Sequence, residues 1–243
     1  MMNLGGDERI YPASMTKIMT ALLTIENLPD LNETITVPED IFEELTAQDA
    51  SVAGFNPYEQ PTVRDLLYGV LLPSGADACE TLARAVGGSE EGFVAMMNQK
   101  AEELGLTNTH FENCTGLHND NHYSTCRDIA VLMSECLKSD TFREIVTREV
   151  YTTEATASHP EGITLYDTML HRFTSYEMST TLENGAVIEG GKTGFTDEAG
   201  QCLVSFAEYG GEEYILVTAE AMTDSGSAVD SIADASTVYG RLQ

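Results

Sequence analysis

The pattern of apolar and polar residues changes in the last third of the chain. Before that point apolar residues recur three and four positions apart, the spacing of one helical face, whereas after it they alternate with polar residues. Helices in the middle followed by an antiparallel sheet at the C-terminal end predict an α+β fold. No internal repeat or low-complexity linker marks a boundary, so residues 1–243 are expected to form one domain.

Capping residues and glycine stops set the limits of the predicted helices. Thr62 and Ser89, for example, stand where an N-cap belongs, and Gly87-Gly88 ends a helical pattern that starts near Ala76. The predicted helices run from Ser14 or Met15 to Leu23, Val63 to Leu72, Ala76 or Asp77 to Val86, Glu90 to Leu104, Ser124 or Thr125 to about Lys138, Ser139 or Asp140 to about Val146, and about Ser227 to Arg241.

Strands are predicted mainly near the C-terminal end. Residues Gln201 to Ala207 and Glu213 to Ala219 alternate around Tyr209-Gly210-Gly211-Glu212, which indicates an antiparallel hairpin. The segment from Ala186 to Gly194 is expected to lie on or enter an edge strand. The remaining expectations are short strands at Thr34 to Val37 and Val150 to Thr156, an acidic segment at Glu39 to Asp49, and loop with a short helix at Ser158 to Asn184.

One candidate for chemistry stands at the start of the first predicted helix. Ser14 is placed as an N-cap or first-turn residue, and Lys17, three positions on, lies beside it on the helix surface. A hydroxyl, an amine and unpaired helix N–H groups would then meet in one place, which is an arrangement for a nucleophile. The simpler interpretation is a serine cap followed by a solvated lysine, because a Ser-x-x-Lys match is a weak pattern by itself.

Two further segments carry groups that suit a peptide substrate. In Lys192-Thr193-Gly194 the amine and the hydroxyl fit a substrate carboxylate, and Gly194 lets another backbone approach closely. The alternative for this segment is a glycine-rich turn with a surface lysine. Ser74 lies in a turn between two predicted helices, where it is either a cap or a hydroxyl that relays protons between lysines.

Composition narrows the range of partners. The formal net charge of −28 would repel nucleic acids and anionic membranes, and no apolar run approaches the ~18 residues of a membrane span. The first six residues, Met1 to Gly6, have neither a basic region nor an apolar stretch, so the sequence is not expected to contain a signal peptide. The five cysteines form no C-x-x-C pair and are expected to be buried thiols.

The three segments, in this order, resemble the penicillin-binding and serine β-lactamase superfamily. Longer strings narrow the resemblance to the D-alanyl-D-alanine carboxypeptidases, which are the low-molecular-weight penicillin-binding proteins. The resemblance covers nearly the whole chain, from about Asp7 onward. The strings that carry it are Tyr11-Pro12-Ala13-Ser14-Met15-Thr16-Lys17-Ile18-Met19-Thr20, Ser74-Gly75-Ala76, Leu104-Gly105-Leu106-Thr107-Asn108-Thr109, Gly116-Leu117-His118, His122-Tyr123-Ser124-Thr125 and Lys192-Thr193-Gly194.

The resemblance implies a β-lactamase/transpeptidase-like fold with a helical subdomain beside an antiparallel sheet. It also implies a serine carboxypeptidase that removes the terminal D-alanine from peptidoglycan stem peptides through an acyl-enzyme and is acylated by β-lactams. Ser14 would be the nucleophile, Lys17 its base once uncharged, and Ser74 the group that passes the proton to the leaving amine. No metal and no cofactor are implied.

Substrate binding is implied for the strand that carries the third motif. Lys192 and Thr193 would hold the terminal carboxylate of the peptide, beside Gly194. The backbone N–H groups of Ser14 and Phe195 would form the oxyanion hole. Because such enzymes act on the cell wall, the full-length protein is expected to work outside the cytoplasm.

The sequence departs from the family pattern in three places. Ala76 stands where the middle motif usually ends in Asn, which removes an amide that would contact the lysine and the substrate. Only thirteen residues precede Ser14, too few for the strand pair of the family, so a sheet of about three strands is expected. Its exposed edge could recruit another chain into an oligomer. The C-terminal β-domain and the membrane anchor of the family have no counterpart in the sequence.

Two alternatives remain open for these segments, and the first of them, a serine β-lactamase, shares the first and the third segment. A serine β-lactamase would need a deacylating carboxylate on a loop, and Glu154, Glu161 and Glu183 form no recognisable pattern for one. A catalytically weak penicillin-binding scaffold domain is the other alternative, because Ala76 replaces the expected amide.

A third alternative is a metal hydrolase. Cys114, His118, Asp120 and His122 fall within nine positions and offer ligands that zinc accepts. The same segment matches the family loop that leads into the cap at Tyr123-Ser124-Thr125, which favours the carboxypeptidase interpretation.

Overall fold

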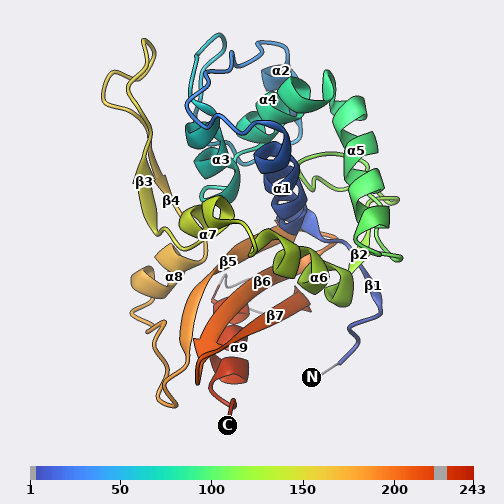
Figure 1. Ribbon diagram of the computed structural model, residues 1–243, viewed down its shortest axis with the longest axis vertical. Coiled ribbons are helices and arrows are strands. Elements are labelled where there is room, and N and C mark those ends of the chain that lie inside the picture. Colours follow the sequence, from blue (N-terminus) through green and yellow to red (C-terminus); the bar gives the residue numbers. More distant parts are fainter. Residues whose placement is uncertain (1–3, 222–228) are drawn as a thin grey trace.

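A helical layer lies on one face of a three-stranded antiparallel sheet, and a C-terminal helix covers the opposite face (Figure 1). The computed structural model describes residues 4–221 and 229–243. In that part the helices are α1 Lys17–Asn27, α2 Ile41–Ala47, α3 Val63–Leu71, α4 Ala76–Gly87, α5 Glu90–Glu103, α6 Cys126–Cys136, α7 Asp140–Val146, α8 Leu170–Ser175 and α9 Asp230–Tyr239, with a 3-10 turn, η1, at Ala13–Thr16. The strands are β1 Arg9–Ile10, β2 Ser124–Thr125, β3 Val150–Thr152, β4 Thr164–Tyr166, β5 Val187–Thr196, β6 Gly200–Tyr209 and β7 Glu212–Ala221.

The sheet has the strand order β5-β6-β7, and its central strand is buried on both faces. Val204 and Phe206 on β6 join the core under the helical layer, whereas Leu203 and Ala207 join a second core under α9. This division follows from the period of two along a strand, which sends successive side chains to opposite faces. The expectation of an α+β fold with a sheet of about three strands is confirmed.

Helix α1 is the centre of the helical layer. Its residues from Lys17 to Thr24 are all buried, and it contacts α3, α4, α5, α6 and α7 (Figure 1). A helix that is buried on every side is a core element rather than an amphipathic surface helix. Any polar group on α1 therefore needs a partner inside the protein, and this condition applies to Lys17 above all.

Several predicted limits were wrong. Ser14 lies inside η1 and caps no helix, since α1 begins only at Lys17. The segment predicted as a strand at residues 34–37 forms a single bridge between Thr34 and Thr62, and the acidic segment after it contains α2. The strand predicted to run to Thr156 ends at Thr152 and pairs with β4, which was not predicted. The predicted start of the last helix at Ser227 lies outside the described residues.

The segment before Ser14 contributes β1, which pairs with β2 in a separate two-residue ladder. Arg9 faces Thr125 and Ile10 faces Ser124 in this ladder. It joins the N-terminal segment to the start of α6 and leaves β7 as an edge strand of the main sheet within the described residues.

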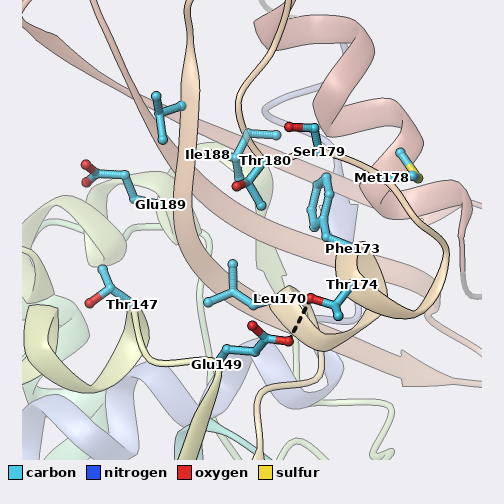
Figure 2. A pocket seen from close by; sticks show the side chains of 11 residues that line it. Thr147, Glu149, Leu170, Phe173, Thr174, Met178, Ser179, Thr180, Ile188 and Glu189 are labelled. Atoms are coloured by element: carbon cyan, nitrogen blue, oxygen red, sulfur yellow. Dashed lines mark hydrogen bonds between the residues drawn. The ribbon is translucent and has the colours of Figure 1, made fainter.

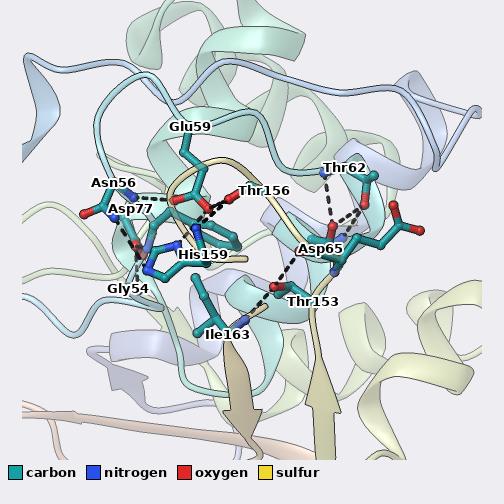
Figure 3. A network of polar contacts seen from close by, with 12 residues as sticks. Gly54, Asn56, Glu59, Thr62, Asp65, Asp77, Thr153, Thr156, His159 and Ile163 are labelled. Carbon is teal, nitrogen blue, oxygen red and sulfur yellow. Dashed lines mark hydrogen bonds and ion pairs between the residues drawn. The ribbon is translucent and has the colours of Figure 1, made fainter. Parts of the chain in front are cut away.

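A carboxylate anchors the loop that faces the turn between α3 and α4. Both oxygens of the buried Asp77 accept backbone N–H groups of this loop, from Ala53 at 2.7 Å and from Gly54 and Phe55 at 3.0 Å each (Figure 3). The loop is packed so closely that a Cβ on Gly75 would lie 2.7 Å from the backbone nitrogen of Ala53. Asp77 thereby fixes the turn that contains Ser74.

A second carboxylate extends this network to the hairpin of β3 and β4. Glu59 accepts hydrogen bonds from the Asn56 N–H at 2.8 Å and from the hydroxyl of Thr156, and its Oε1 lies 2.8 Å from the Nδ1 of His159 (Figure 3). Together these contacts hold the loop at residues 53–59 and the loop between β3 and β4 against the helical layer. The carboxylates accept hydrogen bonds that polar groups of the loops would otherwise make with water.

In the part of the chain that the structure describes, no helix combines the length and the apolar character needed to traverse a lipid bilayer.

Replacing Asp77 with Asn should lower the free energy of unfolding by about 2–4 kcal/mol, because three N–H groups lose an ionised acceptor and the amide adds a buried donor. Chemical denaturation at neutral pH measures this change. The exposed Asp49 provides the matched control, and its Asn variant should stay within about 0.5 kcal/mol of the wild type. Equal stability of the Asp77 and Asp49 variants would contradict the anchoring role.

Candidate active site

Ser14 lies where the helical layer meets the edge of the sheet. Its 3-10 turn packs against β5, and a Cβ on Gly194 would lie 3.1 Å from the Ser14 nitrogen and 3.0 Å from the carbonyl oxygen of Pro12. On the other side Gly116, at φ +83°, approaches so closely that a Cβ there would lie 1.9 Å from the Ala13 oxygen. Only glycine permits the approach at Gly116, and a Cβ at Gly194 would be tight, so the two backbones fix the place of the half-buried serine.

The residue before Ser14 has a strained backbone. Ala13 adopts φ 45°, in the left-handed region that costs a residue with a Cβ about 1 kcal/mol or more. Ser74, in the turn between α3 and α4, has φ 65°. Both serines of the predicted site therefore lie at or beside positive φ, a feature that is common at functional sites.

Lys17 brings its amine to the hydroxyl of Ser14. The Nζ of Lys17 lies 3.0 Å from the Oγ of Ser14 and donates to the carbonyl oxygen of Thr115 at 2.6 Å. The lysine is only 3% exposed. The structure therefore brings together the hydroxyl and the amine that the sequence predicted as neighbours.

Burial lowers the pKa of the Lys17 amine, because an ammonium ion loses its hydration there. Negative charge on Cys79, Cys114 or Asp77 would oppose this shift. However, burial raises the pKa of Cys79 to about 12 and raises that of Cys114 well above its ordinary value, so both thiols are neutral near pH 7. Asp77 then remains as the opposing charge among the three, and the net effect of the site is to lower the Lys17 pKa.

Lys192 provides a second buried amine in the same region. It is 1% exposed, and its Nζ donates to the carbonyl oxygen of Thr193 at 3.1 Å. Burial and then the positive charge of Lys17 lower its pKa, whereas the buried carboxyl group of Asp167 opposes the shift. A positive charge on Lys17 therefore acts on Lys192, and simultaneous protonation of the two amines is disfavoured.

The other predicted residues of β5 lie next to this amine. The hydroxyl of Thr193 is 2.6 Å from the hydroxyl of Thr168, and Thr193 is buried. Phe195 is 55% exposed and is the second-to-last residue of β5. Near its other end, the Ile188 N–H of β5 donates to the carbonyl oxygen of Thr180 at 2.8 Å.

Ser74 is buried, and its hydroxyl has no hydrogen-bond partner among the residues that the structure describes. An unpartnered buried hydroxyl is costly and often marks a place for a ligand or a water molecule. Three residues further on, Asp77 exerts its charge on Lys17, so the turn faces the same part of the protein. Ala76 is 1% exposed and its N–H donates to the Ser51 oxygen at 2.7 Å.

The structure does not gather the four residues of the metal alternative. His122 uses both ring nitrogens, since Nδ1 accepts the Glu112 N–H at 3.1 Å and Nε2 lies 2.8 Å from the Thr16 hydroxyl. Among the described residues, one group could hold a metal ion by the proximity of its ligand atoms, and it shares only Cys114 with the predicted set.

A cavity of about 730 Å³ lies away from these groups, beside the beginning of β5 (Figure 2). At its rim the hydroxyl of Thr174 donates to Glu149 at 2.7 Å. None of the predicted site residues lines it. The lining residues are Thr147, Glu149, Leu170, Phe173, Thr174, Met178, Ser179, Thr180, Val187, Ile188 and Glu189.

Sequence reasoning missed three residues that shape the site. Thr115 contributes a backbone carbonyl, which leaves no signal in the choice of side chain. Asp167 lies close enough for its charge to act on Lys192, and Thr168 contacts Thr193 through its hydroxyl. Both belong to the segment before α8 that the sequence presents only as irregular.

Comparison with known proteins places this geometry in a family. A family model for D-alanyl-D-alanine carboxypeptidases matches residues 1–223. The chain belongs to the D-alanyl-D-alanine carboxypeptidase family. Its carboxypeptidase relatives include DacF of Bacillus subtilis (strain 168), 36% identical over 91% of this chain, and an enzyme of Streptomyces sp. (strain K15), 36% identical over 86% of it. The chain covers 54% of the length of the first relative and 72% of the second, so it spans only part of each.

Solved structures agree with the assignment to the carboxypeptidase family. The Streptomyces K15 DD-transpeptidase superposes with a TM-score of 0.82 at 32% identity, over 98% of this chain and 90% of that one. Penicillin-binding protein 5 of Haemophilus influenzae gives a TM-score of 0.79 at 27% identity, over 96% of this chain and 64% of that one. The predicted fold and the predicted family are both confirmed.

The carboxylates considered for a β-lactamase are all exposed. Glu154 and Glu161 lie in the loop between β3 and β4, and Glu183 lies in the turn before β5. Within the described residues none of the three has a hydrogen bond to Ser14 or Lys17. The structure therefore offers no specific support for the β-lactamase alternative.

His122 gives the site a pH dependence in its stability. Burial lowers the pKa of this histidine to about 3 in the folded protein, whereas an unfolded chain has a value of about 6.5. Between these two values the unfolded state binds one more proton, so stability is lost as the pH falls.

A His122→Asn variant should remove this part of the pH dependence. Between about pH 6.5 and pH 5 the free energy of unfolding of the wild type should fall by about 2 kcal/mol more than that of the variant. Denaturant unfolding at a series of pH values measures both curves. Parallel curves would show that His122 is not held neutral in the folded state.

Proposed function

We propose that this chain is a serine-type D-alanyl-D-alanine carboxypeptidase domain that removes the terminal D-alanine from peptidoglycan stem peptides. The observation that carries the proposal is the 3.0 Å separation between the Ser14 hydroxyl and the buried Lys17 amine, beside the edge strand that holds Lys192. Membership of the carboxypeptidase family supports it. Residues 1–243 would form one catalytic domain.

Lys17 acts as the general base in the proposed reaction. Its uncharged amine takes the proton of Ser14 while the hydroxyl oxygen attacks the carbonyl carbon between the two D-alanines. The hydrogen bond to the Thr115 carbonyl orients the amine and keeps its lone pair available for this proton. A tetrahedral intermediate forms, and its collapse breaks the peptide bond to leave an acyl group on Ser14.

Ser74 completes the proton transfer. Its buried hydroxyl, which has no partner among the described residues, passes the proton from Lys17 to the nitrogen of the leaving D-alanine. A water molecule then attacks the ester on Ser14, with Lys17 again as the base, and releases the shortened peptide. Ala76 supplies no side-chain amide, so in this proposal the middle motif contributes only the hydroxyl of Ser74 and no amide contact to Lys17 or the substrate.

β5 and η1 bind the substrate in this proposal. The amine of Lys192, when protonated, and the hydroxyl of Thr193 hold the terminal carboxylate of the peptide. The backbone N–H groups of Ser14 and Phe195 stabilise the oxyanion, and the close approach of Gly194 to Ser14 brings them to one place. β-Lactam antibiotics would acylate Ser14 through the same contacts.

The cellular setting and the assembly are proposals of the same kind. The substrate belongs to the cell wall, so the full-length protein would act outside the cytoplasm, either in the envelope or after secretion. β7 is an edge strand within the described residues and could pair with another chain, although Glu212 and Glu220 on that strand oppose self-pairing. Native mass spectrometry tests the oligomer: a dimer supports pairing, and a monomer at all concentrations contradicts it.

Incubation with benzylpenicillin should give one covalent adduct that peptide mapping places on Ser14. The adduct should disappear in Ser14→Ala and remain in Ser158→Ala, a matched change at an exposed serine. The same protein should release D-alanine from a peptide that ends in D-Ala-D-Ala. Folded wild-type protein without any adduct would favour the scaffold alternative, and rapid turnover of the antibiotic would favour a β-lactamase.

Replacing Lys17 with Ala should slow acylation by benzylpenicillin about 10²- to 10⁴-fold, because the general base is lost. Stopped-flow or quenched-flow measurement of the adduct gives the rate constant. Lys138→Ala removes the same side chain at a position that is 68% exposed, and this variant should be acylated at the wild-type rate. A similar rate in the Lys17 variant would remove that residue from the mechanism.

A further inference from the structure

Two carboxyl groups and a thiol meet behind the candidate active site. Glu80 on α4, Glu90 at the start of α5 and Cys114 bring their oxygen and sulfur atoms within 4.8 Å of one another. Glu80 and Cys114 are buried, and Glu90 is half-buried. Cys114 directly precedes Thr115, whose carbonyl oxygen accepts a hydrogen bond from the Lys17 amine.

Three helices hold Cys114 through three different groups. Its backbone N–H donates to Glu90 Oε1 at 3.2 Å, its thiol donates to Glu80 Oε1 at 3.4 Å, and its carbonyl oxygen accepts the Thr20 hydroxyl of α1 at 2.6 Å. A residue that is fixed at its nitrogen, its side chain and its oxygen leaves little freedom to the next peptide group. The position of the Thr115 carbonyl therefore depends on both carboxyl groups.

Two ionised carboxyl groups this close together repel each other, so a proton on Glu80 stabilises the pair. Burial, then the charge of Glu90 and a hydrogen bond with it, raise the pKa of Glu80 to about 8. The guanidinium of Arg84 lies 3.8 Å from Glu80, but it also pairs with Asp40 at 2.8 Å. Its positive charge is therefore shared between two carboxyl groups and only partly offsets the negative charge of Glu80.

The proton of the pair can exchange with solvent. A cavity of about 220 Å³ reaches both carboxyl groups, and its other titratable lining groups are Glu44, Arg84, Glu112 and His118. Glu44 and Glu112 outnumber the one guanidinium, that of Arg84, so these side chains add negative charge and favour retention of the shared proton.

We propose that Glu80 and Glu90 share one proton and act as positioning residues, because the protonated pair fixes Cys114 and thereby the Thr115 carbonyl that orients the Lys17 amine. This inference rests on the proposed function. When the pair loses its proton, two like charges remain in one buried place and separate. The segment of Cys114 and Thr115 then shifts, and Lys17 loses its alignment with Ser14.

The test compares the pH profile of acylation by benzylpenicillin in the wild type and in Glu80→Gln, whose amide stays neutral at every pH. The ratio of variant to wild-type rate constants should be about 1 near pH 6.5 and should rise about 3- to 10-fold near pH 9.5. Titration of Lys17 and Lys192 affects both proteins alike and cancels in the ratio. A ratio that does not change with pH would overturn the proposal.

Glu102→Gln is the matched control, since Glu102 is an exposed residue of α5 and the change in charge is the same. Its ratio to the wild type should stay near 1 at all pH values. The measurements are repeated after treatment with a chelator. A rate that depends on added Zn²⁺ would show that a cation, rather than a proton, joins the carboxyl groups, which would also overturn the proposal.

Infrared spectroscopy tests the shared proton without any reaction at Ser14. The difference between wild type and Glu80→Gln near neutral pH should contain the C=O stretch of a protonated carboxyl group, and this band should disappear at alkaline pH. Its absence would overturn the proposal even if Ser14 is acylated. The band together with an unreactive Ser14 would leave the shared proton in place, reject the proposed function and remove the positioning role.

Discussion

The burial of the Lys17 amine is the constraint on which the rest of the site depends. An ammonium ion at this place would cost several kcal/mol relative to water, because the contacts there offer too little negative charge to replace its hydration. The structure satisfies the uncharged amine instead, with the Thr115 carbonyl at 2.6 Å and the Ser14 hydroxyl at 3.0 Å. The same burial that makes this lysine costly as a cation lowers its pKa and so favours its use as a base.

The two layers of the fold cooperate to create this environment. α1 is buried on every side, so its first residue enters the protein interior directly, and η1 turns Ser14 toward β5. Gly116 and Gly194 allow the neighbouring backbones to close around the serine. The chain is strongly acidic and has only four lysines. Two of them, Lys17 and Lys192, are buried at this site.

Sequence periodicity, together with capping residues and glycine stops, predicted the helices whose ends are set by neighbouring residues in the chain. α3, with its capping box at Thr62, and α4, which ends before the left-handed Gly88, were predicted to within about two residues. The approximate place of Ser14 beside Lys17 also followed from helical spacing. Ser14 was predicted as an N-cap or first-turn residue, and it lies in the 3-10 turn that leads into α1 without capping a helix.

Contacts between distant segments were beyond the reach of sequence reasoning. The Thr115 carbonyl, the Asp77 anchor and the pair of Glu80 and Glu90 act across separations that no local pattern encodes. α2 was missed because its short acidic sequence carries little apolar periodicity. The sequence therefore predicts the reacting groups, whereas the structure shows what holds them in place.

Titration of the lysine amines by NMR tests the central claim most directly. The chain has only four lysines, so protein labelled with ¹³C and ¹⁵N at lysine gives a spectrum that single Lys→Arg variants can assign. The account predicts that the Lys17 amine is uncharged near neutral pH while Lys100, whose pKa is raised by Glu26, remains an ammonium ion far into the alkaline range. A Lys17 resonance that titrates together with that of Lys100 would contradict the account.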